Sequence, residues 1–145
     1  EGFSRMTALP EGYELTEEID VAAAHAYLAR SYWSPGIPLE TVQRAIANSL
    51  CVAVRHQGEQ VGLARVVTDR ATFAYLADVD VLEAHRGKGL AQGMVQWLHD
   101  HPEPQGLRRW LLMTVDAHPL YEKLGWTPLA HPERGMERHF PDIYA

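Results

Sequence analysis

The sequence has little cysteine and no long hydrophobic run, and these two absences narrow the classes of protein to which it can belong. Its 145 residues include one cysteine, Cys51, and a single thiol cannot form a disulfide within the chain. No apolar run approaches the ~18 residues that a membrane-spanning helix requires, and the start of the chain lacks a charged and then apolar leader. We therefore predict a cytoplasmic protein with no membrane partner.

Positive charge is also scarce. The chain has 13 lysine and arginine residues against 19 aspartate and glutamate residues, which gives a formal net charge of -6. An acidic protein does not attract the phosphates of nucleic acids or the headgroups of anionic lipids. We therefore expect no nucleic-acid partner, whereas a cationic small molecule suits this balance of charge.

The length and composition are those of one globular domain. A chain of 145 residues fits a single domain, and its 46% of hydrophobic residues can form a core. No repeat, low-complexity tract or linker divides the chain, so we predict one domain over residues 1–145. The stretch Glu1–Arg5, which precedes Met6, is expected to be a remnant of the expression vector.

Hydrophobic periodicity predicts a mixed α/β (α+β) fold. A short strand at Tyr13–Leu15 precedes two helices, of which the first is capped by Asp20 and continues to Tyr32, and the second begins near Pro38. The later strands, of which the first three form an antiparallel meander, are expected at Cys51–Arg55, Gln60–Thr68, Ala71–Leu82, Arg109–Val115, Trp126–Leu129 and Met136–Phe140. Two further helices are expected, from Leu90 to near His101 and from Asp116 to Leu124.

The segment Val79–Ala91 has the character of a phosphate-binding turn. A predicted strand leads into Arg86–Gly89, and an amphipathic helix follows at once. The free N–H groups and the positive dipole at a helix N-terminus favour an anion, and glycines let a phosphate approach the backbone. The spacing of the glycines fits neither a P-loop nor the dinucleotide fingerprint. The segment predicts a pyrophosphate site, and the alternative is a helix start with solvated basic residues.

The sequence Arg86-x-x-Gly89-x-Ala91 is followed, about thirty residues later, by a second motif at Thr114–Trp126. The two motifs and their order resemble those of the GNAT superfamily of acetyltransferases. The first matches the family's acetyl-CoA signature, R/Q-x-x-G-x-G/A. The later segment Thr114–Trp126 resembles N-x-x-A-x-x-F/L-Y-x-K-x-G-F, with threonine in place of the asparagine and tryptophan in place of the phenylalanine. The residues that match this second motif in register are Ala117, Leu120, Tyr121, Lys123 and Gly125.

The resemblance implies the GNAT fold, a twisted and mostly antiparallel sheet with helices on both faces and a splayed central pair of strands that holds acetyl-CoA. By position, backbone groups of Val79 and Val81 would bind the pantetheine arm. The residues that would bind the pyrophosphate are Arg86, Gly87, Lys88, Gly89, Leu90 and Ala91. We expect acetyl-CoA as co-substrate and no metal, because the pair His99 and His101 has no evident third ligand.

The resemblance also assigns chemistry to Tyr121, which stands at the position of the family's usual general acid. An amine attacks the thioester, and a phenol near the sulfur can protonate the leaving thiolate. Asp78 is the candidate base or amine anchor, since it lies on the same face of a strand as Asp80 and paired carboxylates can raise one pKa. Alternatively, Tyr121 is a half-buried aromatic residue, and Asp78 caps a bulge or pairs with an arginine. Many members of the family use a chain of water molecules in place of a direct base, and this is the alternative to Asp78 in that role.

Three residues are expected to line the acceptor site: Tyr32 and Trp33, which can hold an ammonium by cation–π contact or serve as core anchors, and Asp80. The function that we expect is transfer of an acetyl group from acetyl-CoA to a primary amine of a small molecule. The alternatives are acetylation of a protein N-terminus or lysine, and a CoA-binding sensor without turnover. Small members of this family are often dimers, so a homodimer is one expected assembly.

Overall fold

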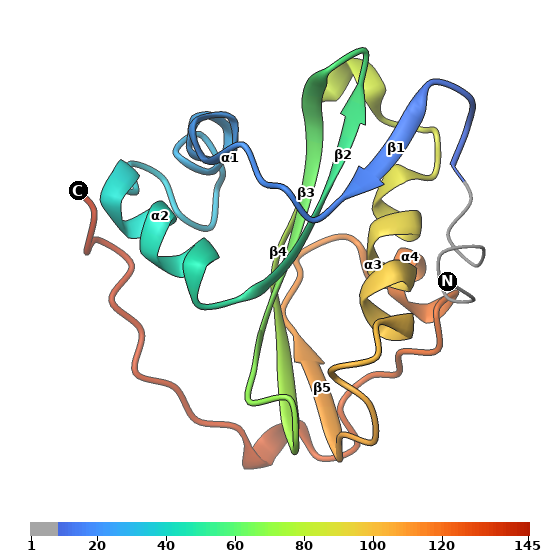
Figure 1. Ribbon diagram of the computed structural model, residues 1–145. Helices are drawn as coiled ribbons and strands as arrows, with labels where there is room; N and C mark the ends of the chain where they lie inside the picture. The colour runs from blue at the N-terminus through green and yellow to red at the C-terminus, as the bar shows by residue number, and fades with distance from the viewer. Residues whose placement is uncertain (1–8) are drawn as a thin grey trace.

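A five-stranded sheet forms the centre of the computed structural model, which describes residues 9–145. The expected remnant Glu1–Arg5 lies outside these residues. The strands follow one another across the sheet in the order β1-β2-β3-β4-β5, with α1 and α2 on one side and α3 and α4 on the other (Figure 1). The strands are β1 (Tyr13–Thr16), β2 (Leu50–His56), β3 (Glu59–Thr68), β4 (Phe73–Val81) and β5 (Arg109–Leu112). The helices are α1 (Val21–Leu28), α2 (Leu39–Ala47), α3 (Leu90–Asp100) and α4 (His118–Glu122), and single 3-10 turns lie at Glu83–His85 and Pro132–Arg134.

The predicted antiparallel meander of β2, β3 and β4 is confirmed. The turn between β2 and β3 consists of Gln57 and Gly58, which both have positive φ angles, of 54° and 83°. Two central residues with positive φ form the turn whose twist matches that of the flanking strands. Between β3 and β4, the carboxylate of Asp69 accepts hydrogen bonds from the backbone N–H groups of Ala71, Thr72 and Phe73, so local polar contacts fix this turn as well.

A β-bulge lies in the middle of β4. Arg65 of β3 lies opposite Asp78, but the next residue, Val66, lies opposite Leu76. Ala77 therefore has no partner in β3, and the extra residue reverses the side to which the following side chains point.

This reversal sorts the side chains at the end of β4 by chemistry. Val79 and Val81 pack with the core beneath α3. Asp78 and Asp80 point to the opposite face of the sheet, toward α1 and α2, where Asp80 lies opposite the buried Leu63. The prediction that the two aspartates share one face is therefore confirmed.

The predicted splayed pair of strands consists of β4 and β5, which are parallel. Their pairing runs from Phe73 and Arg109 to Leu76 and Leu112. β5 ends there, whereas β4 continues to Val81 without a neighbour on that side. The two strands consequently separate beyond this point, as the resemblance to the GNAT family implies.

Two cores hold the helices to the sheet. The buried face of α3 includes Met94, Val95 and Leu98 and packs on β2, β3 and β4. On the other face, α1 and α2 pack on the sheet residues Cys51 and Leu63, and burial raises the pKa of the Cys51 thiol to about 11. Among the residues described, no helix is long and apolar enough to cross a membrane.

The first helix is shorter than predicted. Asp20 caps it as expected, since its carboxylate accepts a hydrogen bond from the N–H of Ala23, but α1 ends at Leu28 and not at Tyr32. The hydroxyl groups of Ser31 and Ser34 both donate to the carbonyl of Leu28, at 2.7 and 3.1 Å. Serine side chains thus take the place of the next helical N–H groups.

The prediction of a buried strand over Arg109–Val115 is wrong in its length, because Met113 and Val115 lie beyond β5 and are 70% and 73% exposed. The prediction of two last strands is also wrong, since residues 113–145 form none. Pro128 interrupts Trp126–Leu129 and cannot donate to a neighbouring strand. The segment Met136–Phe140 has no strand beside it, and it runs apart from the sheet toward α2 (Figure 1).

We predict that Leu98→Ala lowers the free energy of unfolding by about 2–5 kcal/mol, because it leaves a cavity in the core beneath α3. Leu98 is fully buried, whereas Leu39 on α2 is 43% exposed. Leu39→Ala is therefore the matched control, with an expected loss of about 1 kcal/mol or less. Urea-induced unfolding measures both values, and equal losses would contradict the core described here.

Candidate active site

A cleft of about 350 Å³ lies where β4 and β5 diverge. It is bounded by the end of β4, the glycine-rich turn, the first turn of α3, the loop after α1 and one residue of α4. The residues that line it are Trp33, Val79, Asp80, Val81, His85, Arg86, Gly87, Gly89, Leu90, Ala91, Gln92 and Leu120. Most of the residues predicted for the site therefore come together here, and those that do not line the cleft are Tyr32, Asp78, Lys88 and Tyr121.

The glycine-rich turn leaves room for a ligand. Gly87 and Gly89 both have φ angles of 77°, in the left-handed region that favours glycine. A Cβ added at either residue would have no heavy atom within 4 Å. No side chain among residues 9–145 caps the N-terminus of α3, so the N–H groups of its first turn are available to an anion.

Arg86 supplies positive charge at the cleft, but its side chain is partly engaged. Its Nε donates a hydrogen bond of 2.9 Å to the carbonyl of Val81, and its Nη2 lies 3.9 Å from Oδ1 of Asp80. The guanidinium group therefore lies across the end of β4, between the glycine-rich turn and the aspartate. Lys88 is exposed and does not line the cleft.

Asp78 links the sheet to the loop after α1. Its Oδ2 accepts a hydrogen bond of 2.6 Å from Nε of Arg65, and its Oδ1 accepts one of 2.7 Å from Nε1 of Trp33. Arg65 also donates to Oγ of Ser49. Because both oxygens of this buried carboxylate are occupied, its evident effect is to hold the indole of Trp33 at the wall of the cleft.

Asp80 is the carboxylate that lines the cleft itself. Its side chain is 16% exposed, and burial raises its pKa, although the positive charge of Arg86 opposes this shift. Asp78, two residues earlier, raises the pKa of Asp80 further. The strand geometry thus gives the two aspartates different surroundings, one occupied by donors and one facing the cleft.

Tyr121 is buried in α4, next to Leu120, which lines the cleft. Burial raises the pKa of its phenol to about 12, and the neighbouring phenol of Tyr32 contributes to the shift. The ring of Trp126 packs edge-on against it, with 5.9 Å between the ring centroids. The phenol therefore stays protonated at neutral pH.

The aromatic pair Tyr32 and Trp33 lies in the loop after α1. The rings meet edge to face with 5.0 Å between their centroids. Trp33 is fixed by Asp78, whereas Tyr32 is 64% exposed and lies outside the cleft lining. Of the two aromatic residues predicted for the acceptor site, the structure thus brings only Trp33 to the cleft, with Tyr32 beside it.

Two residues of the site have no signal in the sequence. Arg65 is recognisable as the partner of Asp78 only once the register of β3 and β4 is known. His85 lines the cleft, and its Nδ1 lies 2.7 Å from the hydroxyl of Tyr13. Since Tyr13 is 72 residues away in sequence, no local pattern could have predicted this contact.

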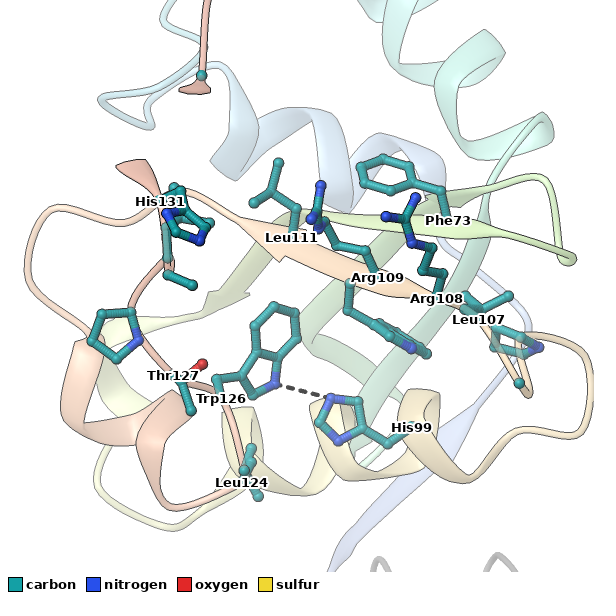
Figure 2. Close-up of a pocket in the computed structure, with 18 of the residues that line it drawn as sticks. Phe73, His99, Leu107, Arg108, Arg109, Leu111, Leu124, Trp126, Thr127 and His131 are labelled. Carbon is teal, nitrogen blue, oxygen red and sulfur yellow. Dashed lines mark hydrogen bonds between the residues drawn. The ribbon is translucent and has the colours of Figure 1, made fainter. Parts of the chain in front are cut away.

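His99 lies in the last turn of α3, and His101 directly follows this helix. Within the described part of the chain, no group of three or more suitable side chains could hold a metal ion. His99 instead accepts a hydrogen bond of 3.1 Å from Nε1 of Trp126 (Figure 2), and burial lowers the pKa of this imidazole.

Comparison with known proteins is consistent with this geometry. The sequence model of the acetyltransferase (GNAT) family matches residues 11–126. A Gibberella zeae protein assigned as an acetyltransferase is 31% identical over 128 residues, which cover 72% of this chain and 71% of the relative.

Solved structures show the same fold. The crystal structure of a protein from Xanthomonas campestris pv. campestris, assigned as an acetyltransferase of the GNAT family, is 42% identical and has a TM-score of 0.89. The match covers 95% of this chain and 99% of that protein. Glucosamine-6-phosphate N-acetyltransferase from Arabidopsis thaliana, at 17% identity and a TM-score of 0.66, covers 90% of this chain and 99% of its own, and shares the fold.

We predict that Asp78→Ala lowers the free energy of unfolding by about 2–3 kcal/mol, because it leaves the largely buried guanidinium of Arg65 without its carboxylate. Glu103→Ala is the matched control, since it removes the partner of Arg70 from an exposed ion pair and should change stability little. Thermal and urea unfolding measure the difference. A loss no greater than that of the control would show that the Asp78 network does not stabilise the fold.

Proposed function

The chain belongs to the acetyltransferase (GNAT) family, and from this premise we propose that it transfers an acetyl group from acetyl-CoA to a primary amine of a small molecule. The observation that carries the proposal is the cleft at the divergence of β4 and β5. An anion-binding turn lies at one part of this cleft, and a half-buried carboxylate and an indole lie at another.

The residues of the turn fit the pyrophosphate of coenzyme A. Gly87 and Gly89 leave open space above the backbone, the first turn of α3 offers free N–H groups, and Arg86 lies beside them. Beyond Leu76, β4 has no strand on its open edge, so backbone groups near Val79 are available to the amides of the pantetheine arm. When bound, the cofactor supplies a thioester, which is the activated form of the acetyl group.

Tyr121 is proposed to be the general acid. Its phenol is protonated, because burial raises its pKa to about 12, and it directly follows Leu120, the residue of α4 that lines the cleft. As the C–N bond forms and the C–S bond breaks, Tyr121 donates its proton to the leaving sulfur.

Asp80 is proposed to accept the proton of the amine, and Asp78 to position the acceptor wall. The oxygens of Asp78 are occupied by Arg65 and Trp33, so they are poorly placed to receive a further proton. Asp80 faces the cleft and its pKa is raised by burial, which suits a general base. A negative carboxylate in the same cleft as the indole of Trp33 also favours an ammonium group.

The indole of Trp33 and the carboxylate of Asp80 in the cleft suit a small cationic amine as the acceptor. The cytoplasm is the compartment in which we expect this reaction, since the buried thiol of Cys51 is free. Acetylation of peptides, and CoA binding without turnover, are the alternatives that the following experiment distinguishes.

We predict that Tyr121→Phe lowers kcat by about 10²–10³-fold with little change in KM, because it removes the proton donor for the leaving thiolate. Free-thiol release from acetyl-CoA is measured over a panel of amines, amino acids and peptides. Tyr144→Phe is the matched control. The group of Tyr144 that approaches Gly36, in the loop after α1, is its backbone carbonyl, which this substitution leaves unchanged.

Each outcome of this panel has a defined meaning. Turnover with small amines alone supports the proposed acceptor class, whereas turnover with peptides alone replaces it. Binding of acetyl-CoA without any turnover would indicate a sensor, and an unchanged kcat for Tyr121→Phe would remove the phenol from the mechanism.

We also predict that kcat/KM rises with pH as Asp80 and the amine lose their protons. We expect no decrease of kcat/KM at any pH up to about 10. The descending limb is absent because the pKa of Tyr121, about 12, keeps the phenol protonated. Asp80→Asn should lower kcat/KM by about 10²-fold and remove the contribution of this carboxylate to the acidic limb. An acidic limb that changes in Asp78→Asn and not in Asp80→Asn would exchange the roles of the two aspartates.

A further inference from the structure

One titratable side chain that lines the cleft has no part in the proposed mechanism, and this is the imidazole of His85. His85 directly precedes Arg86 and ends the 3-10 turn Glu83–His85. Two hydrogen bonds of 2.9 Å fix the backbone here, since the N–H of Leu82 donates to the carbonyl of Val61 and the N–H of His85 donates to that of Leu82. The imidazole therefore extends from a well-supported backbone.

The imidazole belongs to a cluster of rings from segments that are far apart in the sequence. Nδ1 of His85 lies 2.7 Å from the hydroxyl of Tyr13 in β1. His56, at the end of β2, lies opposite Tyr13 in the strand register and stacks on its ring, with 4.4 Å between the centroids. The centroids of the two imidazoles are 5.1 Å apart. Packing and a hydrogen bond therefore fix the orientation of the His85 ring before any ligand binds.

The contact with Tyr13 leaves the second nitrogen of His85 available to a ligand. The side chain of His85 makes no other hydrogen bond among residues 9–145. A phenol that donates to Nδ1 leaves the proton of the neutral imidazole on Nε2, and the charged imidazole carries a proton there as well. Nε2 is thus a hydrogen-bond donor in either state, which suits an anion.

The charges around the ring leave it without a competing anionic partner. The titratable and charged groups on its own turn, on the adjoining strands and in the glycine-rich turn are Tyr13, His56, Glu59, Asp80, Glu83, Arg86 and Lys88. Within the described residues, none of the three carboxylates in this set forms an ion pair with His85. A negative ligand in the cleft would therefore be the nearest partner of a charged His85.

The pyrophosphate assigned to the glycine-rich turn is such a ligand. Its proposed site begins at Arg86, next to His85, and an anion close to an imidazole favours the charged form of the ring. Two imidazoles as close as His56 and His85 disfavour a charge on both. Because His85 lines the cleft and His56 does not, the anion favours protonation of His85.

We propose that His85 is a further cofactor-binding residue, whose Nε2 donates a hydrogen bond to the pyrophosphate of coenzyme A while the hydroxyl of Tyr13 holds Nδ1. The ring takes up a proton as the cofactor binds. Its charge supplements that of Arg86, whose guanidinium is shared with Asp80 and the carbonyl of Val81. Tyr13 acts through the imidazole and is a positioning residue. The inference rests on the proposed use of acetyl-CoA and concerns the binding of this cofactor alone.

We predict that His85→Asn raises the Kd of acetyl-CoA by about tenfold or more, because a hydrogen bond to a charged group is lost. Isothermal titration calorimetry measures this Kd without turnover. The amide of asparagine can replace Nδ1 toward Tyr13, whereas that of glutamine can replace Nε2, so His85→Gln should recover part of the affinity. His139→Asn is the matched control, since His139 is exposed and does not line the cleft, and it should leave the Kd unchanged.

Proton uptake distinguishes an imidazole that binds the anion from one that only supports the turn. Dephospho-coenzyme A is the probe, because it keeps the pyrophosphate but lacks the 3′-phosphate, a monoester that itself titrates near neutral pH. Its binding enthalpy is compared between buffers of different ionisation enthalpy at about pH 6–7.5, where an imidazole titrates. The wild type should take up protons and bind more weakly as the pH rises. Both effects should be largely lost in His85→Gln, which binds as a neutral donor.

Tyr13→Phe tests the positioning role of the phenol. It should raise the Kd of acetyl-CoA by about two- to fivefold in the wild type, because the imidazole loses one hydrogen bond that orients it. In the background of His85→Asn it should have no effect, since its influence passes through the imidazole. Urea unfolding of each variant verifies that it folds.

The outcomes separate this inference from the proposed function. A wild type that does not bind acetyl-CoA would remove both. An unchanged Kd in His85→Asn would overturn the inference alone, and so would equal losses in His85→Asn and His85→Gln without proton uptake in the wild type. An effect of His85→Asn on acetyl-CoA that is absent with dephospho-coenzyme A would assign the ring to the 3′-phosphate and overturn its assignment to the pyrophosphate.

Discussion

β4 and β5 are hydrogen-bonded only as far as Leu76 and Leu112, and β4 then continues alone to Val81. A pair of strands that stops pairing halfway exposes backbone groups inside the sheet, where they would otherwise be used by a neighbour. The cleft occupies this opening, and the glycine-rich turn at the end of β4 brings the N-terminus of α3 to it. Both parts of the proposed cofactor site therefore depend on the divergence of these two strands.

The bulge at Ala77 gives the same strand its chemical asymmetry. Without the extra residue, the side chains that follow would lie on the opposite faces of the sheet. With it, Asp78 meets Arg65 and Trp33, while Asp80 meets the cleft. One carboxylate thereby holds Arg65 and Trp33 and the other lines the cleft, so two identical side chains two residues apart have different surroundings.

β5 has two edges, and the fold uses them differently. The inner edge pairs with β4 as far as Leu112, and the cleft lies beyond the end of this pairing. The outer edge pairs with no other strand of residues 9–145. It faces a separate groove, whose other wall is the chain after α4 (Figure 2).

The sequence by itself determined those features that depend on neighbours within a few residues. These are the cap at Asp20, the turn at Gln57 and Gly58, and the glycine-rich start of α3, because side-chain oxygens and positive φ angles act locally. The motif around Tyr121 identified the family, but not that this side chain is buried. Only the tertiary structure decided the register that pairs Arg65 with Asp78 and the absence of the last two strands within the described residues. These features depend on which segments distant in sequence become neighbours, and strand-forming residues such as Met136–Phe140 form a strand only where a partner edge is within reach.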